Sequence, residues 1–365
     1  MSKENKSSYA AAGVDTEAGE RAVDLMRSAI AKSTRSEVVG DFGGFAGLFD
    51  ISAFKTMTKP LLATSTDGVG TKIDVARRMD IHDTVGIDLV AMVVDDLVVC
   101  GAQPLFMTDY IAVGKVHPER VAAIVTGIAN GCVMAGCALV GGETAEHPGL
   151  LGIDDYDIAG AGTGVVDAAE LLGPDRVVAG DVAIAIGSSG LHSNGYSLAR
   201  HVAFDVAGLD VHDHVAEFGR TLGEELLEPT RIYAKDILNL ISAIPVHSIS
   251  HITGGGIAAN VARVLPANLA LDLDRSTWSP QAIFAWLQAR GNIEQIEAEK
   301  TFNMGIGMLA FLPESAVQLA ITSLQASGLS AWACGSVRSR NAGETGDAIA
   351  KGGNGGAVTL VGNYK

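Results

Sequence analysis

The stretch Thr64-Ser-Thr-Asp-Gly-Val-Gly-Thr-Lys72 follows the apolar residues Leu61-Leu62-Ala63 and brings a carboxylate, two glycines, a hydroxyl and an ammonium group close together. Glycines let the backbone approach a ligand and present N–H groups to anionic oxygens. In such a loop Asp67 could hold Mg²⁺, and Lys72 could neutralise a phosphate group. The alternative is a turn from a strand to a helix, with Asp67 as the helix cap. The stretch is not a Walker loop, because Thr71 precedes the lysine rather than following it.

Composition and charge narrow the class of protein. The chain has 365 residues, enough for two domains, and 48% of them are apolar, so a full core is available. Glycine supplies 44 residues, about 12% against a usual value of about 7%, which indicates many tight turns. The net charge of −16 argues against nucleic acid and against an anionic membrane as the main partner. An anionic small substrate would need a local pocket of N–H groups, cationic side chains and metal.

We expect a cytoplasmic protein. The segment Met1–Ser8 lacks the apolar core of a signal peptide. The longest apolar run, Ile87–Cys100, is interrupted by Asp88, Asp95 and Asp96 and is too short to span a membrane. The four cysteines show no CxxC pair, which favours reduced thiols in a cytosol.

Periodicity predicts a mixture of helices and strands without the strict alternation of a Rossmann or barrel fold. The predicted helices are 17–32, 84–101, 118–136, 195–207, 231–243, 279–290 and 313–327, and the predicted strands are 104–113, 137–140, 156–166, 182–186, 246–252, 268–273, 304–312 and 330–337. Residues 40–48 are rich in Gly and Phe and predict a loop that could act as a lid. The fold class is therefore α+β (mixed α/β) with two domains, 1–170 and 171–345, followed by a Gly-rich tail at 346–365.

Two further motifs carry acids. Asp95 and Asp96 lie inside the predicted helix 84–101, where adjacent acids in an apolar helix are costly unless they are paired or bind metal. Because neighbours on a helix point about 100° apart, the two side chains are not expected to bind one ion in the same way. The stretch 138–146 delivers two glycines and Glu143 to the tip of a strand, which makes Glu143 a candidate Mg²⁺ ligand. The alternative for Asp95 and Asp96 is that they lie on the exposed face of an amphipathic helix. The alternative for 138–146 is a glycine turn with a solvent-exposed Glu143.

Two Gly-rich loops could bind anions. The stretch Gly187-Ser-Ser-Gly-Leu-His-Ser-Asn-Gly-Tyr196 lies between a predicted strand and a predicted helix, where a phosphate could sit at the helix N-terminus. His192 within it could neutralise charge or donate a proton, although a lone His is usually structural. The stretch His251-Ile-Thr-Gly-Gly-Gly-Ile257 places three glycines before a helix and indicates either close approach to an anion or a tight turn.

Taken together, the chain resembles the phosphoribosylformylglycinamidine cyclo-ligase family, also called AIR synthetase. The resemblance runs in order from residue 8 to about residue 312. The matching strings are Ser8-Tyr9, Ala12-Gly-Val-Asp15, Gly43-Gly-Phe45, Thr66-Asp-Gly-Val-Gly-Thr-Lys72, His82-Asp-Thr-Val-Gly-Ile-Asp-Leu-Val-Ala-Met92, Leu139-Val-Gly-Gly-Glu-Thr-Ala-Glu146, Gly187-Ser-Ser-Gly190, His192-Ser-Asn-Gly-Tyr-Ser197, Pro229-Thr-Arg-Ile-Tyr233, Thr253-Gly-Gly-Gly256 and Thr301-Phe-Asn303.

The resemblance implies a homodimer of two-domain subunits that uses ATP and Mg²⁺ to close formylglycinamidine ribonucleotide to aminoimidazole ribonucleotide, releasing ADP and phosphate. A monovalent cation could also be required. By motif, the catalytic residues would be Asp67, Lys72 and His192, and the metal ligands Asp67, Asp96 and Glu143. ATP and its phosphates would contact Gly43, Gly44, Gly68, Thr71, Asp96 and Glu143. The ribonucleotide would contact Ser188, Ser189, Gly190, His192 and Asn194.

Four positions depart from the usual family pattern, namely Arg27, Asp95, Cys100 and Gln103. They leave open which acid binds which ion. Selenophosphate synthetases would need a reactive Cys near an N-terminal Gly-rich loop, whereas the first Cys here is Cys100. Hydrogenase-maturation relatives would need a C-terminal Cys, and thiamine-phosphate kinases lack the match in the second half. A non-catalytic ATP-binding paralogue is the second hypothesis.

Overall fold

The computed structural model describes residues 16–40, 44–350 and 352–365. The first half of the molecule is built on a four-stranded sheet in the order β3-β6-β4-β5. Its strands are β3 (Pro60–Gly68), β4 (Gln103–Val113), β5 (Ala138–Glu146) and β6 (Tyr156–Asp167). β6 pairs antiparallel with both β3 and β4, whereas β4 and β5 run parallel.

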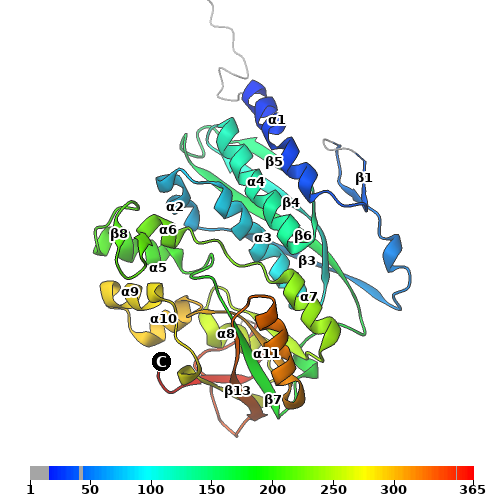
Figure 1. The fold of residues 1–365 in the computed structure, drawn as a ribbon, viewed down its shortest axis with the longest axis vertical. Coiled ribbons are helices and arrows are strands. Elements are labelled where there is room, and N and C mark those ends of the chain that lie inside the picture. Colours follow the sequence, from blue (N-terminus) through cyan, green and yellow to red (C-terminus); the bar gives the residue numbers. More distant parts are fainter. Residues whose placement is uncertain (1–15, 41–43, 351) are drawn as a thin grey trace, which may run out of the picture.

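Helices cover one face of this sheet. α1 (Thr16–Ser33), α4 (Pro118–Ala135) and α3 (Asp83–Val98) lie side by side across it (Figure 1). α3 is apolar on nearly all sides because the sheet, α4 and the second half of the chain all pack against it. α3 and α4 approach closely at Gly86, where a Cβ atom would lie only 2.4 Å from the carbonyl oxygen of Ile124.

Short elements connect the helices and the sheet. β1 (Val38–Val39) and β2 (Leu48–Phe49) form a two-stranded ribbon before β3, followed by a 3₁₀ turn (Ser52–Phe54), and α2 (Lys72–Met79) follows β3 directly. Part of the predicted loop 40–48, residues 41–43, lies outside the described residues, and so does Gly43 of the predicted ATP site.

The second half is built on a six-stranded sheet in the order β10-β12-β7-β13-β11-β14. Its strands are β7 (Asp181–Gly187), β10 (Ser248–His251), β11 (Leu269–Asp274), β12 (Ile306–Pro313), β13 (Ala331–Ser339) and β14 (Ala357–Val361). Its helices are α5 (Tyr196–Arg200), η4 (His201–Val206), α6 (Leu222–Leu226), α7 (Ala234–Ala243), α8 (Gly256–Arg263), α9 (Ala282–Gly291), α10 (Gln295–Thr301) and α11 (Val317–Ala326). A short β8–β9 ribbon (His214–Val215 and Arg220–Thr221) precedes α6.

The α+β prediction is confirmed, and the differences have local causes. The strand expected to end at Val140 continues to Glu146, because β5 stays paired to β4 along its whole length despite its glycines. The helix expected at 195–207 is divided into α5 and a π-helical segment. Residues 346–365 are not a tail outside the second half, because β14 pairs parallel with β11.

The cores of the two halves form one continuous cluster of buried side chains, with α3 at the contact between them. No helix in the described part of the chain is both long and apolar enough to span a membrane.

Candidate functional site

The register of the first sheet sets the spacing of the predicted acids. Asp67, Gly160, Asp109 and Gly142 form one row across β3, β6, β4 and β5, and the next row ends at Glu143. Three steps between strands separate the ends of a row, a distance of about 14 Å. Asp67 and Glu143 therefore lie on opposite edges of the sheet.

Asp67 lies at the end of β3, next to the turn into α2. Its carboxylate accepts the backbone N–H of Gly68 at 2.7 Å. α2 begins at Lys72, and its N-cap residue Thr71 makes no side-chain capping bond. The alternative in which Asp67 caps the helix is therefore wrong. The hydroxyl of Thr71 is exposed and lies 3.3 Å from that of Ser197, across the contact between the two halves.

Lys72 is turned into the protein rather than toward the loop. Its side chain is fully buried, and its ammonium donates to Asp88 Oδ1 at 2.9 Å. Burial lowers the pKa of Lys72, and the charge of Asp88 opposes that shift. The sequence-based role of Lys72 as a phosphate contact therefore has no direct counterpart in this geometry.

Two buried carboxylates of α3 hold a segment of the second half. Asp88 accepts the backbone N–H of Thr230 at 2.7 Å, and Asp95 accepts that of Tyr233 at 3.0 Å. Burial raises the pKa of Asp95 to about 7, although the charge of His251 opposes that shift. Asp88 and Asp95 are seven residues apart, so they share one face of the helix. We call this contact, α3 with residues 228–234, the junction.

Asp96 points away from the junction and toward a cavity between the two halves. Its carboxylate contacts His251 Nδ1 at 2.9 Å. Burial alone would lower the pKa of His251, but the hydrogen bond to Asp96 and the charges of three nearby acids raise it above its ordinary value. His251 Nε2 is buried and has no partner in the described residues.

This cavity has a volume of about 340 Å³, and we call it the interdomain cavity. Strand β3 contributes Thr64 and Ser65, and α8 contributes Asn260 and the exposed cation Arg263. Asn260 donates to carbonyl oxygens of the triple-glycine loop and so fixes its shape. The cavity therefore lies between the β3 edge of the first sheet and β10 and α8 of the second half.

The predicted substrate loop is held by hydrogen bonds within itself and to the neighbouring segment at Pro229. Ser188 Oγ donates to the carbonyl of Gly190, and Ser189 Oγ donates to that of Pro229. His192 is buried, and its Nε2 accepts the N–H of Ser189 at 3.2 Å. Burial lowers the pKa of His192 well below its ordinary value, so the ring is neutral near pH 7.

Asn194 is the residue of this loop that lies next to the triple-glycine loop. It lies against Met92 of α3, and a Cβ atom built on Gly254 would lie 3.4 Å from Asn194 Oδ1. The structure thus brings Asn194 to the triple-glycine loop, whereas the two serine hydroxyls are occupied by carbonyl oxygens within the second half.

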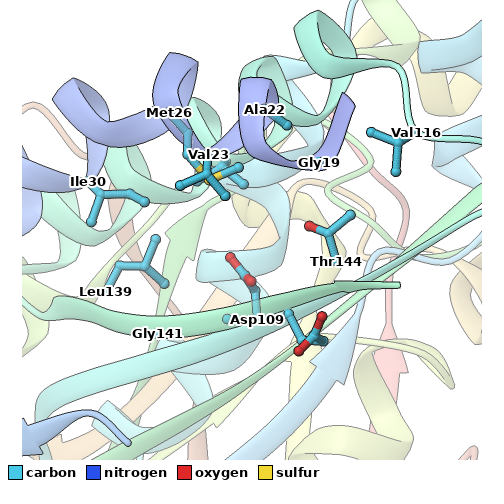
Figure 2. A pocket seen from close by; sticks show the side chains of 13 residues that line it. Gly19, Ala22, Val23, Met26, Ile30, Asp109, Val116, Leu139, Gly141 and Thr144 are labelled. Atoms are coloured by element: carbon cyan, nitrogen blue, oxygen red, sulfur yellow. The ribbon is translucent and has the colours of Figure 1, made fainter. Parts of the chain in front are cut away.

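A second cavity lies at the other end of the sheet, beneath α1. It has a volume of about 250 Å³, and we call it the α1 cavity. Figure 2 shows Ala22, Val23, Met26 and Ile30 of α1 on one side and Asp109 and Thr144 on the other. Glu143 also lines the cavity. Burial raises the pKa of Asp109 to about 7.

Gly44 is brought to this end of the sheet as well. It lines an adjoining cavity of about 600 Å³ that also contacts Asp109, Gly141 and Gly142. The structure therefore groups Gly44 with Glu143, and it groups Asp67 with Asp96 through His251. Within the described residues, no three His, Cys, Asp or Glu side chains are placed to hold a metal ion by themselves.

Sequence reasoning missed three polar residues of these sites. Asp88 was noted as an interruption of an apolar run and within a matching string but was not chosen as a site residue, although its spacing of seven from Asp95 was a usable signal. Asp109 was hidden inside a predicted strand, where a single acid carries no pattern. His251 was quoted within the triple-glycine stretch but was not chosen as a site residue.

Comparison with known proteins covers both halves. Residues 48–166 match the family described as AIR synthase related protein, N-terminal domain, and residues 178–347 match its C-terminal domain. A phosphoribosylformylglycinamidine cyclo-ligase of Syntrophotalea carbinolica is 50% identical over 315 residues, covering 86% of this chain and 90% of the relative. One from Geotalea daltonii is 47% identical over 335 residues, covering 92% and 96%.

Solved structures share the fold at much lower identity. Thiamine-monophosphate kinase from Stenotrophomonas maltophilia superposes with a TM-score of 0.63 at 17% identity, over 94% of this chain and 97% of that one. Hydrogenase maturation protein HypE in complex with ATP gives 0.62 at 16% identity, over 88% and 86%. These likenesses show the fold alone. The two matched domains and the identity to the named relatives show that the chain belongs to the phosphoribosylformylglycinamidine cyclo-ligase family.

Proposed function

We propose that the protein converts formylglycinamidine ribonucleotide and ATP to aminoimidazole ribonucleotide, ADP and phosphate. The observation that carries the proposal is the near-50% identity to relatives named for this activity, which extends through both domains. That identity favours the cyclo-ligase over a non-catalytic ATP-binding paralogue. The proposal makes the chain a ligase of purine biosynthesis.

The reaction needs placement and charge neutralisation more than covalent help from the protein. The amide oxygen of the substrate attacks the γ-phosphorus of ATP, and ADP leaves. An amine of the same molecule then attacks the activated carbon, closes the five-membered ring and expels phosphate. Cationic groups and N–H donors around the phosphates would stabilise the charge that develops.

The donor set suits Mg²⁺ with ATP. Mg²⁺ is usually bound by one or two carboxylates plus phosphate oxygens and water, so a ready cluster of three protein ligands is not required. Because Asp67 and Glu143 lie on opposite edges of the sheet, Asp67 and Asp96 would supply carboxylates to one ion and Glu143 to another, and the bound ions would neutralise phosphate charge. The likeness to ATP-bound HypE supports the nucleotide at the level of fold.

The two cavities suggest separate binding sites for the nucleotide and the ribonucleotide. Glu143 and Gly44 would face the nucleotide at the β5 edge of the sheet, where the α1 cavity offers an apolar wall, and Gly68 would face its phosphates beside Asp67 at the β3 edge. The ribonucleotide would occupy the interdomain cavity, where Arg263 provides positive charge in a chain of net charge −16 and the buried His251 Nε2 has no partner in the described residues. Asn194 and the buried His192 loop would border it. In this arrangement the main histidine contact to the anion would be His251, whereas the sequence had suggested His192.

A homodimer is also part of the proposal. Among the described residues, the sheet of the first half carries helices on one face only. On its other face Leu62 of β3 and Tyr110 of β4 have exposed fractions of 71% and 43%. Exposed apolar residues on a sheet favour contact with a second copy. Sedimentation at micromolar concentration should give twice the monomer mass, and a monomer throughout would contradict this part.

The central test is turnover. Purified protein with formylglycinamidine ribonucleotide, ATP and Mg²⁺ should form aminoimidazole ribonucleotide and ADP in equal amounts. Asp67→Asn should lower the rate at least about 100-fold with the fold retained, because it weakens charge neutralisation at the phosphates. Asp205→Asn, at a carboxylate 71% exposed on the π-helical segment, is the matched control and should keep the rate. Binding of ATP without product would instead favour the non-catalytic paralogue.

A further inference from the structure

Lys72 follows the Gly-rich loop directly, yet all its hydrogen-bonding capacity is directed inward. Besides Asp88, its ammonium donates to the carbonyl oxygen of His192 at 3.1 Å and to that of Glu228 at 2.6 Å. An ammonium has three N–H donors. All three are occupied, and the side chain is fully buried, so none is left for a phosphate.

Asp88 extends the same contact to the next segment. Its Oδ1 accepts the backbone N–H of Thr230 at 2.7 Å and the hydroxyl of Thr230 at 2.6 Å. The ion pair of the first half therefore holds two separate segments of the second half, one at His192 and one at Glu228–Thr230. Replacing a buried ion pair with apolar residues often leaves stability unchanged, so stability alone does not account for it.

His192 has a backbone that needs such support. Its φ angle is +62°, a region that non-glycine residues adopt only where their surroundings hold them. The Lys72 ammonium fixes its carbonyl, Ser189 donates to its ring, and the ring packs on Tyr233 with centroids 6.1 Å apart. Tyr233 is itself tied to α3 through Asp95. The shape of the loop thus depends on side chains of the other half.

We propose that Lys72 is a positioning residue, whose ammonium, paired with Asp88, holds the 187–196 loop in place against the Thr64–Lys72 loop. This inference rests on the proposed function, because it assumes that the 187–196 loop borders the ribonucleotide. Lys72 joins the two substrate sites mechanically, because its backbone belongs to the loop with Asp67 and its ammonium holds the carbonyl of His192. It does not contact ATP.

Separate Michaelis constants for the two substrates test this role. In Lys72→Met, the kcat/KM for formylglycinamidine ribonucleotide should fall at least about tenfold, while the KM for ATP changes less than about threefold. A residue that contacts phosphate would show the opposite pattern. A tenfold rise in the KM for ATP alone, or no kinetic change at all, would overturn the proposal.

A second variant covers the case in which Lys72→Met fails to fold. The double variant Lys72→Met/Asp88→Asn leaves no unpaired buried charge and keeps an acceptor for Thr230. It should fold and still show the loss in kcat/KM for the ribonucleotide, because nothing replaces the bond to His192. Full kinetic recovery in the double variant would mean that the pair matters only for stability, and the proposal would fail.

Hydrogen exchange gives a readout that does not depend on activity. Amides of residues 188–196 should exchange at least about tenfold faster in the double variant, whereas amides of β7 stay protected. Val75→Ala, a fully buried change on α2, is the control for general destabilisation and should leave this local pattern as in the wild type. If the wild type made no product, the proposed function would fail while this exchange test still decided the role of Lys72. Unchanged amide exchange of residues 188–196 in the double variant would contradict the positioning role of Lys72.

Discussion

The junction and the α1 cavity place their acids in different surroundings: Asp88 at the junction is fully buried, whereas Asp109 in the α1 cavity is half-buried. At the junction, Asp88 faces the Lys72 ammonium and two donors of Thr230. In the α1 cavity, Asp109 faces apolar side chains of α1 and α4, and burial raises its pKa to about 7. A paired charge fixes geometry, whereas an acid among apolar groups favours its neutral form and can answer to a ligand or to pH. The junction thus holds one geometry, whereas the ionisation state of the acid in the α1 cavity can change.

The strongest way to break this comparison is to remove one partner at the junction. Asp88→Ala leaves Lys72 as a buried unpaired cation and should cost about 3–5 kcal/mol of unfolding free energy. Urea denaturation followed by circular dichroism measures the loss. Asp88→Asn keeps an acceptor for Thr230 and should lose less. Equal losses in the two variants would mean that the hydrogen bonds of Asp88 carry no weight.

A smaller effect is expected in the α1 cavity from crowding Asp109. A Cβ atom on Gly142 would lie 1.9 Å from Asp109 Oδ1, so Gly142→Ala should destabilise the protein by about 1–3 kcal/mol. The neighbouring Gly141→Ala is the matched control, since its nearest contact would be 4.0 Å away. Thermal unfolding compares the two. Adding Asp109→Ala should restore most of the loss, and failure to do so would place the clash elsewhere.

The smallest effect concerns pH. The pKa of Asp109 is raised in the folded protein, so its neutral form stabilises the fold fully below about pH 4 and loses that contribution as pH rises through about 7. Asp109→Asn cannot ionise. Its melting temperature relative to the wild type should therefore rise by about 3 °C or more between pH 5 and pH 8. A difference independent of pH would mean that Asp109 is ionised throughout.

The fold class and most strands could be read from the sequence because they depend on local periodicity. The register that aligns Asp67, Gly160, Asp109 and Gly142 could not, since it depends on the pairing of strands up to a hundred residues apart. Motifs also identified Asp67, Asp96 and Glu143 as candidates by residue type. The direction of the Lys72 side chain was not encoded in its loop, because Asp88 and the carbonyls that attract it lie far along the chain.

The site residues, like the fold, divide into those that local sequence identifies and those that depend on distant contacts. His192 was chosen because it stands in a Gly/Ser loop, yet burial lowers its pKa well below the ordinary value, whereas the pKa of His251 in the interdomain cavity is raised by the hydrogen bond to Asp96 and the nearby acids. Nothing local distinguishes the two histidines. The difference arises from Asp95 and Asp96, which reach His251 from a helix more than 150 residues away.

The place of β14 has a practical consequence for making variants of this protein. β14 covers one edge of β11, and beyond it the Tyr364 hydroxyl bonds to Glu299 and the amide of Lys365 bonds to the carbonyl of Trp278. Trimming the chain at residue 356 to remove a Gly-rich segment would expose the backbone of β11 as an open sheet edge, which invites self-association. The described residues of 341–356 form neither helix nor strand, yet Asp347 bonds to Val358 and Leu360 and so holds β14, and a shortened chain must keep it.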